Sequence, residues 1–351
     1  MNYLSKNKNN IQKQILQWYE LNGRKNLPWK TSNIYKIWIS EIMLQQTQVK
    51  TVIPYYNRFI NKYPDINALY NSSLDNILEM WSGLGYYRRA ENIHKTASIV
   101  KHEYNGLFPT KFKDIIKLPG IGRTTASAIL TFSRTARLPI LDGNIKRLFA
   151  RYFFLNTNLT IREQENLLWK ISEDLLPIKN SDNFCQALMD LGSLICTKND
   201  PKCSFCPIRN NCKSKLKQNF TIRIHKPKLK KDQKRVYSLF ITNKQNCVYL
   251  ERINFKNLWK GLFSSPLFTN HQQMLIWMKE NKLENNLQQD KYNIEHNLSH
   301  IKFIFTVYFC QINTNKNITE NREYWYNLSN IKCAIPKFQD KIINLYREKY
   351  G

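Results

Sequence analysis

Four of the eight cysteines stand close together in one short segment of the chain. They follow the pattern C-x6-C-x2-C-x5-C, at Cys196, Cys203, Cys206 and Cys212. Thiolates this close in sequence can converge on one centre, and four sulfur ligands suit either tetrahedral zinc or an iron-sulfur cluster. Ligand chemistry leaves both metals open, and four unrelated buried thiols are the remaining alternative. The spacing therefore predicts a metal centre that ties the segment into a compact loop.

The charge of the chain predicts an acidic partner. Its 351 residues suggest two domains, and 54 Lys and Arg against 26 Asp and Glu give a formal net charge of +28. A hydrophobic content of 42% excludes a disordered basic tail, so the charge must lie on folded surfaces. Nucleic acid is the leading partner for such a surface. A coding bias toward Lys and Asn is the alternative explanation.

No segment of the sequence has the length and apolarity of a membrane span. The first ten residues contain no apolar stretch, and apolar runs such as 304–309 fall far short of the roughly 20 residues that a helix needs to cross a bilayer. We therefore expect a soluble cytoplasmic protein without a membrane partner, in which structural disulfides are absent.

Hydrophobic periodicity changes along the chain. Residues 1–212 follow helical spacing, with a stop signal at Gly23 and a cap signal at Ser72 and Ser73 before the apolar pattern that begins at Leu74. The stretch 213–235 is rich in Lys and Arg and lacks periodicity, which predicts a basic linker. Further helices are expected near 88–104, 124–134, 143–154, 162–176 and 183–195.

Residues 236–351 follow a different pattern, which predicts a second domain of mixed α and β structure. Strands are expected at 236–241, 247–251 and 301–312, where β-branched and aromatic residues gather. Helices are expected near 271–282 and 336–349.

A glycine-rich hairpin stands in the middle of the first domain. The sequence LPGIGR at 118–123 is followed by the helical pattern TTASAILTFS, which is a helix-hairpin-helix signature over 118–134. Gly120 and Gly122 allow a tight turn, so that backbone N–H groups and the following helix N-terminus can hold a DNA phosphate. We therefore name Gly120, Gly122, Arg123 and Thr124 as candidate DNA contacts. An ordinary loop between two helices is the alternative.

Asp142 follows some twenty residues later, before the helical pattern GNIKRLF. By itself it is most simply a helix N-cap. Together, the hairpin, Asp142 and the cysteine pattern resemble the iron-sulfur branch of the helix-hairpin-helix DNA glycosylases. The resemblance implies a mainly α first domain, with a six-helix barrel plus an iron-sulfur domain, and one [4Fe-4S] cluster on the loop 196–212. It also implies that Asp142 is a catalytic carboxylate.

Two further segments are similar to the adenine DNA glycosylases of the MutY family, namely ISEIMLQQTQV at 39–49 and WSGLGYY at 81–87. These enzymes remove adenine mispaired with 8-oxoguanine or guanine from double-stranded DNA. The resemblance implies that Glu41 protonates the departing base, that Asp142 stabilises or captures the oxocarbenium ion, and that Asn144 hydrogen-bonds beside them. This division of labour is known from glycoside hydrolases. Without the resemblance, Glu41 would be interpreted as a structural carboxylate.

The resemblance also implies which residues contact the opened DNA. Gln46 and Tyr86 match the family's wedge and intercalating residues, Leu44 a contact near the lesion pair, and Trp29 an aromatic residue near the adenine pocket. Each of them alone is explained as well by packing. The base must leave the stack before it reacts, and these residues would fill the gap.

Thr124 bears on strand cleavage. In the related endonuclease III branch a lysine at this position forms a Schiff base, whereas a hydroxyl cannot form that imine. We therefore expect little or no lyase activity, with Lys146 as a nearby amine that reacts only adventitiously. Thr124 also departs from the Tyr or Ser of many family members.

Residues 236–351 resemble the family's Nudix-like domain, which implies recognition of 8-oxoguanine. The acids after the LWKGLF turn at 258–263 are too sparse to hold magnesium as a Nudix hydrolase does, so hydrolysis is not expected. HNLSH at 296–300 matches the family's H-x-F-S-H loop, with Leu298 in place of Phe. Ser299 and His300 would contact the lesion or a nearby phosphate. Ordinary surface or packing residues are the alternative.

The sequence thus predicts a monomeric, monofunctional adenine DNA glycosylase that works on the nucleoid of a bacterial-type cell. A second hypothesis is an endonuclease III-like enzyme with lyase activity on oxidised pyrimidines. A third is a non-enzymatic iron-sulfur protein that binds DNA.

Overall fold

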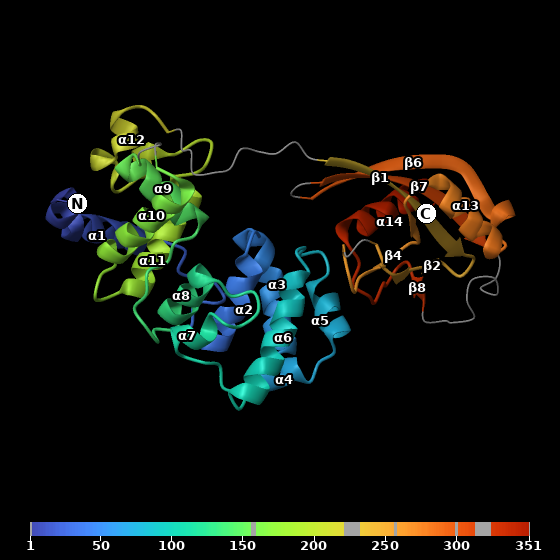
Figure 1. Ribbon diagram of the computed structural model, residues 1–351, viewed down its shortest axis with the longest axis horizontal. Coiled ribbons are helices and arrows are strands. Elements are labelled where there is room, and N and C mark those ends of the chain that lie inside the picture. Colours follow the sequence, from blue (N-terminus) through green and yellow to red (C-terminus); the bar gives the residue numbers. More distant parts are fainter. Residues whose placement is uncertain are drawn as a thin grey trace. The chain divides into compact units, whose positions relative to one another are not determined.

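A computed structural model describes residues 2–155, 159–220, 232–255, 258–298, 301–312 and 324–350 (Figure 1). The described residues divide into two compact units. The first, here called the helical unit, draws on Met1–Tyr70 and Lys95–Pro227. The second, called the sheet unit, draws on Asn71–His94 and Lys228–Gly351. A segment that the sequence places in the first domain thus packs with the C-terminal residues.

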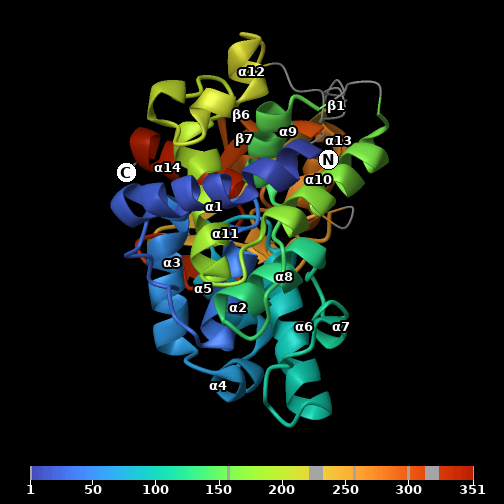
Figure 2. The ribbon, with the colours of Figure 1, turned by 90° about the vertical axis from the view of Figure 1, so that its left-hand side faces the viewer.

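The helical unit forms where the sequence shows helical periodicity. α1 packs across α11 and α10, and α2 packs against α8 and α3 (Figure 2). The helices of this unit are α1 (Asn2–Asn22), α2 (Ile34–Leu44), α3 (Val49–Lys62), α4 (Ile66–Tyr70), α7 (Phe112–Ile115), α8 (Arg123–Phe132), α9 (Gly143–Phe153), α10 (Ile161–Leu175), α11 (Ser181–Asp190) and α12 (Lys213–Leu216), and α6 (Arg88–Glu103) enters it from the sheet unit.

α1 shows how local signals set an element's end and its buried face. Ile11, Ile15 and Tyr19 are buried in a core that they share with α9, α10 and α11. The helix ends before Gly23, whose N–H donates to the Tyr19 carbonyl at 2.9 Å. A Cβ at Gly23 would lie 2.1 Å from the Tyr19 ring, so only glycine fits this close approach. The predicted stop signal is confirmed.

The predicted helix over 183–195 changes type before its end. α11 stops at Asp190, and a π-helix, η1 (Leu191–Ile195), continues to Cys196. In this wider turn Gly192 packs against the start of α9, where a Cβ would lie 2.6 Å from the Cβ of Asn144. π-Turns of this kind are frequent at functional sites.

The sheet unit contains one sheet with the strand order β6-β7-β1-β2-β8 among the described residues, and β5 also pairs with β1. β1 and β7 are parallel over their whole length, from Asp232↔Ile301 to Asn243↔Ile312. The elements of this unit are α5 (Leu74–Trp81), β1 (Asp232–Asn243), β2 (Cys247–Tyr249), β3 (Glu251–Arg252), β4 (Phe263–Ser264), β5 (Leu267–Phe268), α13 (His271–Glu280), β6 (Leu287–Asn297), β7 (Ile301–Ile312), β8 (Trp325–Asn327) and α14 (Lys337–Tyr350).

Two strand predictions need correction, and one further strand was not predicted. The predicted strand over 247–251 breaks after Tyr249, because Glu251 and Arg252 pair with β4 in a separate two-stranded sheet. β6 was not predicted, because its sequence LQQDKYNIEHN is mostly polar, as suits its place at the edge of the sheet. β1 begins at Asp232, ahead of the predicted start at 236, since its first residues pair with β7.

Specific contacts explain why 71–94 belongs to the sheet unit. The Arg252 guanidinium donates to both carboxylate oxygens of Asp75 in α5, at 3.2 and 2.6 Å. The Tyr87 hydroxyl donates to the Ile335 carbonyl at 2.7 Å. α5 starts at the predicted cap, where the Ser73 hydroxyl accepts from the Asn76 N–H.

The predicted linker over 213–235 includes two regular segments, since α12 covers its first residues and β1 its last. Its residues 221–231 lie outside the described residues. None of the described helices has both the length and the apolarity that a membrane span requires.

Candidate active site

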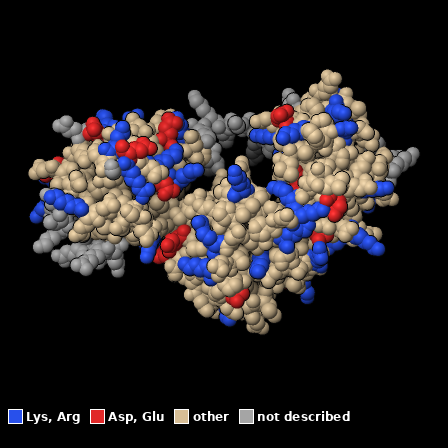
Figure 3. Space-filling view, turned by 180° about the vertical axis from the view of Figure 1, so that it is seen from behind, with Lys and Arg blue, Asp and Glu red and all other residues tan. Residues whose placement is uncertain are grey.

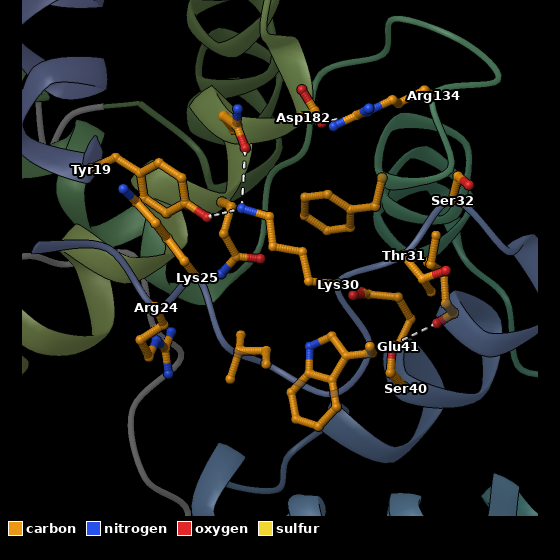
Figure 4. Close-up of a pocket in the computed structure, with 16 residues that line it drawn as sticks. Tyr19, Arg24, Lys25, Lys30, Thr31, Ser32, Ser40, Glu41, Arg134 and Asp182 are labelled. Carbon is orange, nitrogen blue, oxygen red and sulfur yellow. Dashed lines mark hydrogen bonds and ion pairs between the residues drawn. The ribbon is translucent and has the colours of Figure 1, made fainter. Parts of the chain in front are cut away.

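Glu41 lies on the wall of a pocket of about 430 Å³ in the helical unit (Figure 4). The predicted pocket residue Trp29 lines the same pocket and packs edge-on against Tyr56, with ring centroids 5.3 Å apart. In Figure 4 the Lys30 side chain reaches toward Tyr19, whose hydroxyl lies 3.0 Å from the ammonium. The lining that the sequence did not reveal comes from α1, the loop after it, α8 and α11, and includes Tyr19, Arg24, Lys30, Phe132, Arg134, Asp182, Asn183 and Gln186.

The position of Glu41 on α2 gives its carboxyl an apolar setting. α2 begins at the N-cap Asn33, whose side chain accepts from the Lys36 N–H at 3.1 Å. Most of the helix is buried, including both neighbours of Glu41, and Glu41 itself is half-buried. Burial raises the pKa of Glu41 to about 8, and the negative charge of Asp142 adds to the increase. At neutral pH most of the Glu41 carboxyl is therefore protonated.

Asp142 is the N-cap of α9, as its sequence context predicts. One carboxylate oxygen accepts from the backbone N–H groups of Asn144 and Ile145, at 3.0 and 2.8 Å. The other accepts from the Asn144 side chain at 2.9 Å. Burial raises the pKa of Asp142, while these three hydrogen bonds and the nearby Arg147 act in the opposite direction. Three donors and a helix N-terminus favour the ionised form.

The two carboxyl groups therefore have different surroundings. Burial raises the pKa of both groups, but three hydrogen bonds and Arg147 oppose this increase at Asp142, whereas the negative charge of Asp142 adds to it at Glu41. Because the charge of Asp142 also opposes ionisation of Glu41, a proton held by the pair belongs on Glu41. This places an acid and a carboxylate in one site, although Asp142 itself is not among the residues that line the Glu41 pocket.

Arg147 supports the Asp142 end of the site, and the sequence analysis missed it. Its guanidinium donates to the Asn144 side-chain oxygen at 3.0 Å, to the Cys196 carbonyl at 2.8 Å and to the Gly192 carbonyl. Arg147 stands three residues after Asn144, so both lie on one face of α9. This spacing of three residues was the signal in the sequence from which the role of Arg147 could have been predicted.

The predicted hairpin has the expected backbone. Gly120 has a left-handed φ of 78°, and Gly122 precedes the first turn of α8 as its N-cap. The Gln45 side chain, at the end of α2, donates to the Gly120 carbonyl at 3.2 Å and so joins the hairpin to the helix that carries Glu41. Arg123 is exposed and lies over the Trp169 ring, 3.9 Å from its centroid.

Thr124 has a contact that the sequence did not predict. Its hydroxyl donates to the carbonyl of Leu141 at 3.1 Å, immediately before Asp142. The first turn of α8 is thereby tied to the residue that precedes the carboxylate. Lys146, the nearby amine considered for adventitious lyase chemistry, lies 2.6 Å from the carboxylate of Glu165 in an ion pair.

The residues expected to enter DNA have strained backbone conformations. Gln46 and Tyr86 have φ values of 57° and 51°, in the left-handed region that side chains other than glycine rarely adopt. Both are exposed, and Leu44 is half-buried at the end of α2. Gln46 belongs to the helical unit and Tyr86 to the sheet unit. Strain of this kind persists where the surroundings hold it, often at functional sites.

The four clustered cysteines line one pocket beside α9. Burial raises the pKa of the Cys206 thiol to about 12, and the other three thiols oppose its ionisation further. Four thiolates would therefore not form here without a cation among them. Within the part of the chain that the structure describes, no three His, Cys, Asp or Glu side chains are arranged as ligands of a single metal ion. The Arg151 guanidinium lies 3.4 Å from the Cys196 sulfur.

Ser299 and His300 lie outside the described residues, but the elements on either side are defined. β6 and β7 form an antiparallel hairpin, in which Asn297 pairs with Lys302 and the Leu298 N–H donates to the Ile301 carbonyl at 2.8 Å. Burial lowers the pKa of His296, and Lys341 and Lys337 lower it further, so the ring is neutral at pH 7. Of the predicted H-N-L-S-H sequence, His296 and Asn297 thus end β6, and Leu298 follows them.

Comparison with known proteins defines the class. Residues 39–174 match the family model of the HhH-GPD superfamily base excision DNA repair proteins. The adenine DNA glycosylase of Buchnera aphidicola subsp. Baizongia pistaciae is 46% identical over 337 residues, which cover 94% of this chain and 94% of that protein. The adenine DNA glycosylase of Buchnera aphidicola subsp. Schizaphis graminum is 43% identical and covers 95% of this chain and 97% of that protein.

The chain therefore belongs to the adenine DNA glycosylase family, and it is a DNA N-glycosylase of base excision repair. A non-enzymatic DNA-binding protein is excluded. A thermostable thymine-DNA glycosylase matches 61% of this chain and 98% of its own, with a TM-score of 0.56 and 29% identity. An endonuclease III in complex with DNA matches 60% of this chain and 97% of its own, with a TM-score of 0.52 and 20% identity, which shows the fold alone.

Proposed function

We propose that this enzyme hydrolyses the N-glycosidic bond of adenine mispaired with 8-oxoguanine or guanine in double-stranded DNA. The observation that carries the proposal is the pair of carboxyl groups with different surroundings, namely Glu41, whose pKa burial raises to about 8, and Asp142, which accepts three hydrogen bonds at the N-terminus of α9. Family membership supplies adenine as the base.

The two groups divide the chemistry. The adenine base leaves readily only if a proton reaches it as the bond to the sugar breaks, and Glu41 supplies that proton because burial keeps it protonated at neutral pH. The sugar then carries a developing positive charge. The carboxylate of Asp142, held by Asn144 and Ile145, stabilises that charge or bonds to the sugar carbon.

The flipped adenine would enter the pocket beside Glu41, whose lining includes Trp29 as an aromatic wall. Gln46 would act as the wedge, Tyr86 would intercalate and Leu44 would contact the lesion pair. Their exposure and left-handed backbone at Gln46 and Tyr86 support these roles. Unstacking costs a few kcal/mol, which the inserted side chains would offset.

The hairpin would hold the DNA backbone without reading its sequence. Gly120 and Gly122 leave the N-terminus of α8 open, and Arg123 adds a charge beside it. Thr124 would act on the catalytic side, because its hydroxyl holds the residue before Asp142. With no amine at this position, and with Lys146 engaged by Glu165, the enzyme would be monofunctional.

The four clustered cysteines would hold one [4Fe-4S] cluster. The four sulfur donors line one pocket, and four thiolates are the ligand set of such a cluster. When bound, the cluster would supply the cationic centre that keeps the thiolates ionised and the loop 196–212 ordered. Arg147 and Arg151 bind that loop to α9 through the backbone of Cys196, Thr197 and Lys198.

The C-terminal residues would form a Nudix-like domain that recognises 8-oxoguanine opposite the adenine without hydrolysing nucleotides. The β6–β7 pairing supports this role, since it brings Asn297 and Lys302, on either side of the predicted recognition residues, opposite each other. The enzyme would act as a monomer in the cytoplasm.

Base release from four duplexes tests the proposal. Adenine opposite 8-oxoguanine, guanine, cytosine and thymine should be compared on protein of measured iron content. We expect free adenine from the first two, with strand scission only after alkali. Glu41→Gln should abolish release and keep DNA binding, and turnover in that variant would contradict the role of Glu41. Scission without alkali, or release of oxidised pyrimidines, would favour an endonuclease III-like enzyme.

A further inference from the structure

The turn that presents Tyr86 has a left-handed backbone at three residues, and of these only Tyr86 is strained, because glycine adopts this region freely. We call residues 81–89 the Tyr86 turn. Gly83, Gly85 and Tyr86 have φ values of 88°, 76° and 51°, all in the left-handed region. Tyr86 is 50% exposed, so burial of its own side chain does not offset the cost of this backbone conformation. Surrounding contacts must therefore hold it.

Arg89 braces the turn from inside the sheet unit. It is only 7% exposed. Its guanidinium donates to the Gly85 carbonyl at 2.9 Å and to the Tyr86 carbonyl at 3.4 Å, and it lies over the rings of Trp81 and Tyr86. The Trp81 indole N–H donates to the same Gly85 carbonyl at 3.1 Å. The backbone on either side of Tyr86 is thus fixed by side chains within the turn.

Tyr87 ties the turn to residues far along the chain. Its hydroxyl accepts from the Gly83 N–H at 3.1 Å and donates to the Ile335 carbonyl at 2.7 Å. Ile335 stands just before α14, in the C-terminal part of the sheet unit. The hydroxyl oxygen of Tyr87 therefore connects the Gly83 backbone to the segment around Ile335, here called the C-terminal segment. The ion pair of Arg252 with Asp75 makes a second connection between these parts of the unit.

We propose that Tyr87 is a positioning residue, which couples the intercalating Tyr86 to the C-terminal segment through the Gly83 N–H and the Ile335 carbonyl. This inference rests on the proposed function, in which Tyr86 enters DNA. The Tyr86 turn then moves with the C-terminal part of the sheet unit. In the proposed function this part recognises the lesion through its β6–β7 hairpin. Recognition of 8-oxoguanine and insertion of Tyr86 become one event, so a partner base that the C-terminal segment rejects leaves Tyr86 poorly placed.

Tyr87→Phe in the full-length protein tests this coupling, because it removes the phenol oxygen and keeps the ring. The probe is a duplex with 2′-fluoro-2′-deoxyadenosine, which resists hydrolysis, opposite 8-oxoguanine, and with 2-aminopurine beside the 8-oxoguanine. Insertion of Tyr86 unstacks the 2-aminopurine and raises its fluorescence. We expect Tyr87→Phe to weaken the insertion equilibrium about fivefold, which corresponds to one hydrogen bond of about 1 kcal/mol.

Two comparisons separate positioning from general stability. Tyr35→Phe is the matched control, because Tyr35 also donates to a backbone carbonyl at 2.7 Å, that of Tyr63, but in the helical unit. It should leave insertion unchanged. In a Tyr86→Ala background Tyr87→Phe should change binding by less than about twofold, because Tyr87 acts through Tyr86. Full additivity of the two substitutions, or equal effects of Tyr87→Phe and Tyr35→Phe, would overturn the proposal.

The remaining outcomes are also decisive. If Tyr87→Phe does not fold, Arg89→Lys tests the same turn, since lysine keeps the charge but loses the forked contacts to Gly85 and Tyr86. It should weaken insertion, and unchanged insertion would contradict the inference. A wild-type enzyme that inserts Tyr86 but releases no adenine from the natural duplex would overturn the proposed function and leave this inference standing. No fluorescence increase in the wild type would overturn this inference.

Discussion

At the scale of single residues, the central feature is that two carboxyl groups of the helical unit have different hydrogen-bonding surroundings. Desolvation raises the pKa of Glu41 to about 8, whereas Asp142 has three hydrogen-bond donors and the N-terminus of α9. A residue's type alone does not show which state it adopts. In the proposed function, these surroundings would suit Glu41 to act as the acid and Asp142 as the stabilising carboxylate or nucleophile.

The pH dependence of catalysis follows from Glu41. Because it acts in the protonated form, the single-turnover rate of adenine release at saturating enzyme should be steady below pH 7 and fall as pH rises through about 8. Well above that value the rate should decrease about tenfold per pH unit. Binding of the uncleavable duplex over the same range is the control for lost affinity. A rate that rises through pH 8 would contradict the assignment of Glu41.

Arg147 gives a second prediction at this scale. Arg147→Lys loses the fork that reaches Asn144, Gly192 and Cys196 together, so Asn144 is no longer held beside Asp142. We expect the single-turnover rate to fall about 10- to 100-fold, as small misplacements of catalytic groups do, with little change in DNA affinity. Arg137→Lys is the matched control, since Arg137 also donates to two backbone carbonyls, those of Pro177 and Leu176. Equal rates for both variants would contradict this role.

At the scale of elements, α9 and η1 connect the site to the cysteine loop. One face of α9 carries Asn144, Arg147 and Arg151, which lead from Asp142 to Cys196. η1 carries Gly192 against the start of this helix. The π-turn therefore sets how closely the loop that bears Cys196 approaches the catalytic residues.

Gly192→Ala tests this contact. The added Cβ would lie 2.6 Å from the Cβ of Asn144 and 2.8 Å from its backbone, so η1 or α9 must shift. We expect a loss of about 1 to 3 kcal/mol in the free energy of unfolding, together with slower adenine release. Denaturant titration and single-turnover kinetics measure the two effects. Gly143→Ala is the control for stability, because a Cβ there meets no atom within 4 Å. A Gly192→Ala enzyme as stable as wild type would contradict the argument.

At the scale of the whole molecule, the two units have separate cores and share the excess of positive charge. Lys and Arg side chains are spread over the face shown in Figure 3. Such charge supplies affinity for DNA that depends on salt and not on sequence. In the proposed function, specificity would come from weakly charged features, namely the Glu41 pocket, the Tyr86 turn and the β6–β7 hairpin.

Removal of the proposed iron-sulfur cluster should lower the stability of the helical unit and leave that of the sheet unit unchanged. All four clustered cysteines belong to the helical unit, and Cys196, Cys206 and Cys212 pack against its core. Cys206→Ser, or chelation of the metal, should lower the melting temperature of the helical unit by at least about 5 °C, because metal binding contributes folding free energy. Calorimetry measures the melting temperature, and far-UV circular dichroism distinguishes loss of helix from melting of the sheet. A Cys247→Ser variant is the control, and equal melting of both variants would contradict the prediction.

Local sequence determined the helices, the cap at Ser73, the stop at Gly23, the N-cap at Asp142 and the pattern of four cysteines, whereas Glu41 became a candidate only through the family resemblance. These signals depend on neighbours within a few residues, so they are legible without a fold. Tertiary structure alone decided that burial protonates Glu41, that Arg147 joins Asn144 to the cysteine loop, and that the Tyr86 turn belongs with the C-terminal residues. Tyr87 and Ile335 are 248 residues apart in the chain. Burial and contacts at such separations arise only when the chain folds.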